Sequence, residues 1–165
     1  MTDTTRVTAD GRADQIKSLL KDSWPGQIYS QQIRSTRTRS YYFGGLPRRP
    51  QVEIQHTLLG VELKVGRRRF LCPDLATARY LSVFARAGCP AVAIPYDITE
   101  LSRLADELES AWQQMLLLIE DQVPERLRTR IRGLVIAKLR AEIAELGPGT
   151  AIPEFKQSTR QRRTG

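Results

Sequence analysis

Residues 51–95 read QVEIQHTLLGVELKVGRRRFLCPDLATARYLSVFARAGCPAVAIP, and this stretch decides the fold class. Apolar and polar residues alternate over 51–55 and again over 60–65, which is the period-two pattern of half-buried strands. Gly66 allows a tight turn into a returning strand at 69–72. The first half of the stretch therefore predicts an antiparallel ribbon of short strands.

A helix and a buried strand complete the stretch. Asp74 is suited to cap a helix that continues to Ala87, and Gly88 is suited to end it. The apolar run 91–94 is typical of a strand that is buried on both faces. The predicted fold class is α+β, with a small antiparallel or mixed sheet of about four strands covered by helices.

Two helices of opposite charge are predicted after the sheet. The first starts at Asp97 and carries six acidic residues and one basic residue over 99–123. Pro124 ends it and opens a second helix to Leu146, with six basic and three acidic residues over 124–146. The opposite charges predict an antiparallel helix pair whose members partly neutralise each other.

The remaining segments define the domain boundaries. Residues 1–12 predict a flexible N-terminus, and 13–23 predict a short helix that ends at Trp24-Pro25-Gly26. A chain of 165 residues suits one domain, which we place at 13–146. Residues 147–165 have no periodicity and predict a disordered basic tail.

Composition narrows the class of partner. The formal net charge is +8 and the pI is near 10.0, which favours polyanions such as RNA or DNA. No apolar run approaches the ~18 residues of a membrane span, and the polar N-terminus does not resemble a signal peptide. Cys72 and Cys89 are too few for a disulfide framework or a four-ligand zinc site. These features favour a cytoplasmic protein without a cofactor.

Arginines interleaved with tyrosines mark a candidate nucleic-acid interface. In 36–41 the residues alternate between small hydroxyl side chains and Arg37, Arg39 and Tyr41, so one strand face presents guanidiniums and a phenol. The alternative is a solvated edge strand that uses charge to prevent edge pairing. The candidate binding residues are Arg34, Arg37, Arg39, Tyr41, Tyr42, Arg48, Arg49, Arg67, Arg68 and Arg69.

Glu62-Leu63-Lys64 on one strand, with Glu53 on the preceding strand, suggests a catalytic alternative. This arrangement resembles the core of the PD-(D/E)xK nuclease family. The resemblance implies that Glu53 and Glu62 hold Mg²⁺ and that Lys64 helps to activate water. The family usually has aspartate where this chain has Glu53. The competing interpretation is an amphipathic hairpin with solvated Glu–Lys pairs.

The leading hypothesis is a non-enzymatic cytoplasmic protein that binds RNA or DNA mainly through phosphate contacts. The metal-dependent nuclease is the first alternative. The second alternative is a protein–protein adaptor, because the helices of 99–146 carry a long apolar stripe that includes Trp112 and Met115. Such a stripe suits a homodimer or a partner helix, although it belongs to a core more often.

Overall fold

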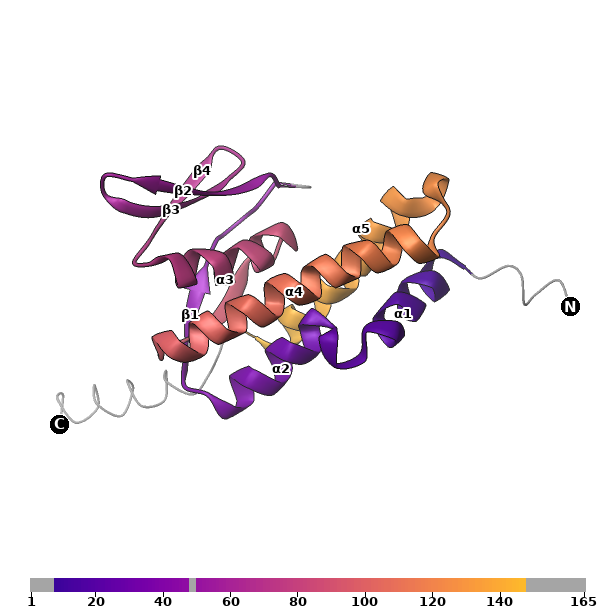
Figure 1. The fold of residues 1–165 in the computed structure, drawn as a ribbon, viewed down its shortest axis with the longest axis horizontal. Helices are drawn as coiled ribbons and strands as arrows, with labels where there is room; N and C mark the ends of the chain where they lie inside the picture. The colour runs from indigo at the N-terminus through magenta and orange to yellow at the C-terminus, as the bar shows by residue number, and fades with distance from the viewer. Residues whose placement is uncertain (1–7, 48–49, 148–165) are drawn as a thin grey trace, which may run out of the picture.

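The computed structural model describes residues 8–47 and 50–147, with the backbone alone at positions 33 and 34 (Figure 1). The described residues form an α+β fold with five α-helices and five strands, which confirms the predicted class. In chain order the elements are α1 (Ala9–Leu20), the 3₁₀ turn η2 (Lys21–Ser23), α2 (Pro25–Ser35), β1 (Thr38–Tyr42), β2 (Val52–Thr57), β3 (Gly60–Val65), β4 (Arg68–Cys72), α3 (Leu75–Arg86), β5 (Ala91–Pro95), α4 (Ile98–Gln122) and α5 (Glu125–Leu146).

Strands β2, β3 and β4 form an antiparallel sheet in the order of the chain. Leu63 and Val65 are fully buried on the face that packs against α3, while Glu62 and Lys64 point to the opposite face. Gly66 adopts a positive φ of 62° in the turn between β3 and β4, as its predicted role requires. The predicted ribbon is therefore confirmed.

The other two strands, β1 and β5, form a separate antiparallel sheet, so the strands divide between two sheets instead of joining one. Ala93 in the middle of β5 shows the physical reason. Its backbone N–H donates to the Tyr29 hydroxyl at 2.8 Å, and its carbonyl accepts from the Tyr80 hydroxyl at 2.5 Å. The two hydroxyls therefore hydrogen-bond to backbone groups on the free edge of β5, which a further strand would need for pairing.

The N-terminal helices depart from the sequence-based boundaries. Helix α1 begins at Ala9, inside the segment predicted to be flexible, because the Thr8 side chain accepts the Gly11 N–H at 3.0 Å. Pro25 starts α2 in place of only ending a helix, since proline is tolerated in a first turn. Helix α2 was not predicted from the sequence. The predicted flexible residues 1–7 and basic tail residues 148–165 lie outside the described residues.

The later helices follow the predicted boundaries. Asp74 caps α3 by accepting the Thr77 N–H at 2.7 Å, and Asp97 caps α4 by accepting the Thr99 N–H at 2.8 Å. Gly88 ends the α3 segment with a positive φ of 75°. Helices α4 and α5 run antiparallel, with α4 across the middle of the molecule (Figure 1).

The expected charge neutralisation between α4 and α5 is not what the structure shows. Among the described residues, no ion pair joins these two helices. The acidic side chains of α4 instead pair with Arg79 of α3 and with Arg103 of α4 itself. Lys138 of α5 pairs with Asp14 of α1 at 2.9 Å. Apolar packing must therefore hold α4 against α5.

The apolar stripe of α4 lies in the core. Leu104, Leu108, Trp112, Met115 and Ile119 are all buried against the rest of the molecule. This face is not available as a docking surface, which removes the observation behind the adaptor hypothesis. No helix among residues 8–47 and 50–147 is long and apolar enough to cross a membrane.

Candidate nucleic-acid interface

Strand β1 and the residue before it place the first predicted arginines. The guanidinium of Arg37 lies 5.9 Å from the ring centroid of Tyr96, whose N–H donates to the Arg37 carbonyl at 3.1 Å. Arg39 follows two residues later on the same side of the strand. Tyr96 is 48% exposed, so its ring is accessible for stacking. Tyr96 was not among the predicted residues, because it directly follows β5 and meets Arg37 only through the pairing of β1 with β5.

Tyr41 connects β1 to the three-stranded sheet of β2, β3 and β4, which we call the hairpin sheet. Its ring centroid lies 5.2 Å from that of Phe43 and 6.4 Å from that of Phe70. Burial raises the pKa of Tyr41, the nearby Cys72 thiol raises it further, and the guanidiniums of Arg39 and Arg68 lower it. Two arginines from separate sheets therefore act on one phenol. The Tyr41 ring is engaged by Phe43 and Phe70, so it is not a free stacking ring.

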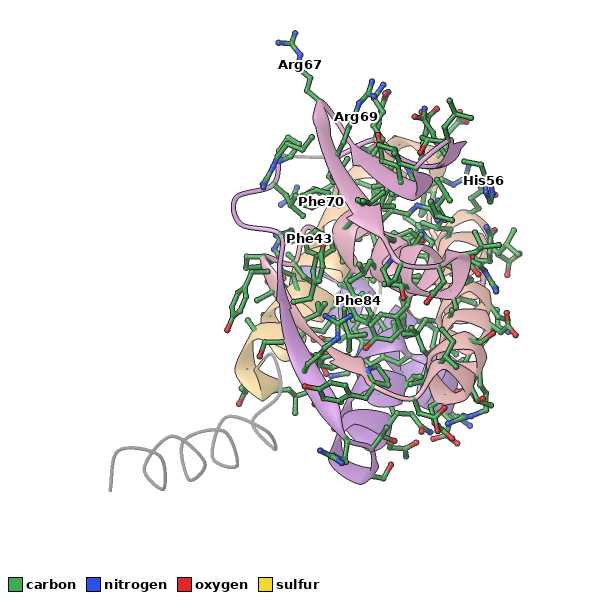
Figure 2. The ribbon with its side chains drawn as sticks, turned by 90° about the vertical axis from the view of Figure 1, so that its left-hand side faces the viewer. Phe43, His56, Arg67, Arg69, Phe70 and Phe84 are labelled. Atoms are coloured by element: carbon green, nitrogen blue, oxygen red, sulfur yellow. The ribbon has the colours of Figure 1, made fainter. Side chains whose placement is uncertain are left out.

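The three consecutive arginines of the hairpin have three different environments. Arg67 extends from the tip of the turn, away from the body of the molecule (Figure 2). Arg68 donates to the Gly45 carbonyl at 2.9 Å and lies 4.8 Å from the Phe70 ring centroid. Arg69 points to the outer face of the sheet, with its Nε 3.5 Å from a carboxylate oxygen of Glu62.

The structure thus brings together part of the predicted set. Arg39 and Arg68 lie near Tyr41, and Arg37 precedes Arg39 by two residues on the same side of the strand; we call these four residues the Tyr41 surface. Figure 2 shows Phe43 and Phe70 side by side between β1 and the hairpin sheet, with ring centroids 5.3 Å apart. Tyr42 is 68% exposed but points to the opposite side of β1 from Tyr41. The Arg34 side chain and residues Arg48 and Arg49 lie outside the described residues.

The carboxylates of the nuclease alternative share the outer face of the hairpin sheet. Glu53 pairs with Lys64 across the strands and Glu62 pairs with Gln55, so the two carboxylates are diagonal neighbours. One Glu62 carboxylate oxygen is buried and accepts no hydrogen bond, and the nearest cation is the Arg69 guanidinium. Within the described chain, no cluster of three or more His, Cys, Asp or Glu residues is placed to hold a metal.

Two arginines on the α3–α4 side of the protein are matched by acidic side chains. Arg79 bonds to Asp106 and Glu109, and Arg103 bonds to Glu100 at 2.5 Å and Glu107 at 2.7 Å. These contacts raise the pKa of both guanidiniums, the hydrogen bonds to the carboxylates being the main cause. In the described part of the chain, the three arginines of the Tyr41 surface form no ion pair with an acidic side chain.

Comparison with models of protein families, with curated protein sequences and with solved structures found no match to this chain.

Proposed function

We propose that this protein binds RNA or DNA without cleaving it, through phosphate contacts made by the Tyr41 surface. The placement of Arg39 and Arg68 carries the proposal: Arg39 lies two residues before Tyr41 on the same face of β1, and Arg68 lies over the Phe70 ring, whose centroid is 6.4 Å from that of Tyr41. Guanidiniums on the same side of the molecule that form no ion pair with a described acidic side chain give a local positive potential, which attracts phosphates and is strengthened by the net charge of +8. The exposed Tyr96 ring beside Arg37 offers a stacking partner for a base.

The arginines are also held in place, which favours binding because fewer rotamers are lost on contact. Arg68 is anchored at Gly45 and over the Phe70 ring, and Arg37 lies over Tyr96. A guanidinium retains unused N–H donors after one such bond, since it carries five in all. Both cysteines are buried and unbridged, which is consistent with the reducing cytoplasm as the proposed location.

A salt series tests the proposal. We expect the logarithm of the binding constant for a single-stranded oligonucleotide to fall linearly with the logarithm of salt concentration. Replacing both Arg39 and Arg68 with Gln should weaken binding and reduce the slope by about 1.4, because each lost phosphate contact on a single strand contributes ~0.7. Replacing both Arg126 and Arg130 with Gln on the exposed side of α5 is the charge-matched control. A slope that is flat, or equally changed by the control, contradicts the proposal.

The same binding reactions distinguish simple binding from the nuclease alternative. Mg²⁺ or Mn²⁺ is added to the wild type and to Glu62→Ala, and the length of the oligonucleotide is followed. The proposal expects intact oligonucleotide in every reaction, because Arg69 is the charged neighbour of Glu62. Cleavage that is lost in Glu62→Ala would replace the binding proposal with metal-dependent hydrolysis.

A further inference from the structure

A second group of arginines lines a hollow between the N-terminal side of β2, the end of α3 and the middle of α5. One part, of about 820 Å³, is lined by Pro47, Arg86 and Arg140 among others. An adjoining part, of about 610 Å³, is lined by Arg86, Trp112 and Arg132 among others. The two parts share Pro50, Arg86, Gly133 and Ile136 along their common boundary. We call the combined hollow the arginine groove.

We propose that the arginine groove binds a small organic anion, in which a phosphate or carboxylate group is attached to an apolar or planar body. Each hollow falls within the roughly 300–1,000 Å³ of typical small-molecule sites. Arg132 and Arg140 lie eight positions apart on α5, which corresponds to about 12 Å along the helix axis. That span suits a ligand about as long as a nucleotide.

The polar half of the site consists of arginine guanidiniums that outnumber the acidic side chains around them. Arg86, Arg132 and Arg140 face one carboxylate, that of Glu120, and none of the three forms an ion pair with a described residue. The Nε of Arg132 is buried and donates to no acceptor in the described chain. An ionised donor that is desolvated without an acceptor is unfavourable, so an oxyanion at this position is stabilised.

Arg140 is held at the groove by the end of α3. Its guanidinium donates to the Ala87 carbonyl at 3.1 Å, where the negative end of the helix dipole also favours a cation. This bond uses one of the five N–H donors and leaves others for a ligand. The anchored guanidinium is thereby pre-organised for a planar, two-oxygen acceptor such as a carboxylate or phosphate.

The apolar half of the site surrounds a bare stretch of helix at Gly133. A Cβ atom placed at Gly133 would meet no neighbouring atom within 4 Å, so packing inside the described protein does not require glycine here. Glycine in a helix interior is nevertheless unfavourable relative to alanine. Its effect on the groove is to leave space open beside Ile136 and Pro50, where an apolar body can lie.

Gly133→Leu separates loss of the site from loss of the fold. Leucine favours the helix more than glycine does and would extend into the open hollow. We therefore expect this variant to melt at or above the temperature of the wild type while its groove is blocked. Arg132→Gln removes the unpartnered donor, and Arg126→Gln on the exposed surface of α5 is the control for loss of one positive charge.

The probe is 8-anilinonaphthalene-1-sulfonate, which joins an anionic group to an aromatic body and fluoresces when it enters an apolar site. We expect saturable binding to the full-length protein, at least ~10-fold weaker in Arg132→Gln, absent in Gly133→Leu and unchanged in Arg126→Gln. Adenosine monophosphate and octanoate are then added as competitors. Displacement by either supports the proposal and shows whether the natural body is planar or aliphatic, with inorganic phosphate reporting the contribution of the anion alone.

Three results would overturn the inference: no binding of the probe to the wild type, equal binding to Gly133→Leu, or displacement by an oligonucleotide but by neither small competitor. The last result would assign the groove to the nucleic-acid interface. Gly133→Leu also distinguishes the two proposals. It blocks the arginine groove but does not alter the Tyr41 surface, so it should lose the probe and still bind the oligonucleotide. If the proposed function fails but the probe still binds only the open groove, the small-anion site stands independently.

Discussion

Arg79 and Arg86 lie about two turns apart on α3, and their surroundings are opposite. Arg79 bonds to Asp106 and Glu109, two carboxylates presented by α4. Arg86 lines the arginine groove, where Arg132 and Arg140 add positive charge and no described acidic side chain pairs with it. On α3, therefore, Arg79 joins the helix to α4, whereas Arg86 contributes to a surface of positive charge that has no described acidic partner.

This difference shows that net charge alone does not locate a binding surface. A chain with a net charge of +8 still pairs some of its arginines with acids, because acids and bases that meet across packed helices are placed by the apolar contacts between those helices. Only arginines that the packing leaves without acids, as at the Tyr41 surface and in the arginine groove, can attract an external anion strongly.

Reversing the charge of the unmatched arginines should have the largest effect, and the effect should be on oligonucleotide affinity. Replacing both Arg39 and Arg68 with Glu should lower oligonucleotide affinity by at least ~100-fold, because like charges placed together across an interface cost several kcal/mol. The measurement is a binding isotherm at one fixed salt concentration. Arg126→Glu with Arg130→Glu makes the same change in net charge on the exposed side of α5. An equal loss in both double variants would show that the position of the charge does not matter.

Removal of the buried Cys89 thiol, beside the arginine groove, should have a smaller effect than charge reversal. The effect should appear in the stability of the protein at alkaline pH. Burial raises the pKa of Cys89 to about 12, while Arg140 lowers it only partly. The thiol has a pKa of 9.0 in the unfolded chain. Its contribution to the unfolding free energy is therefore present in full below pH 9 and is lost as the pH rises from 9 toward about 12. Each thiol of this kind changes the unfolding free energy by up to ~1.4 kcal/mol per pH unit in that window.

Urea unfolding across this pH range measures the effect. We expect a shallower decline in Cys89→Ala than in the wild type, with Tyr29 contributing to the remaining slope because burial raises its pKa to about 12. Identical slopes in the two proteins would mean that the thiol of Cys89 ionises equally well in the folded state.

The two arginines of α3 should give the smallest effects, and effects of different direction. Arg79→Gln should lower the unfolding free energy by about 1 kcal/mol, since the side chain bridges α3 to α4 but remains partly exposed. Arg86→Gln should leave stability unchanged or slightly raised, because it removes one of three neighbouring positive charges. Urea unfolding at neutral pH compares them directly. A larger loss in Arg86→Gln would show that Arg86 has a structural partner.

Local patterns were sufficient to predict much of the fold. The alternation in β2 and β3, the glycine at position 66 and the caps at Asp74 and Asp97 act within a few residues of chain, and each is found as predicted. Helix α2 was missed because its polar composition hides its amphipathic pattern, and Pro25 could be taken as the end of one helix or the start of another.

The candidate site was predicted less completely, for a different reason. The arginines of β1 and of the β3–β4 turn were identified from their spacing and residue type, but their meeting at Tyr41 depends on how two sheets pack. Tyr96 and Arg86 carried no local signal at all. Each becomes a candidate only beside residues that are distant in the sequence, Arg37 for the first and Arg140 for the second.

The sequence by itself determined the α+β class, most element boundaries and the excess of positive charge, because periodicity, caps and net charge are properties of neighbouring residues or of their sum. Tertiary structure alone decided that the strands form two sheets, since the Tyr29 and Tyr80 hydroxyls satisfy the Ala93 backbone from elsewhere in the chain. It also decided which arginines are matched by acids and which are not. Pairing between charges is a property of distance in space, and the order of residues does not specify that distance.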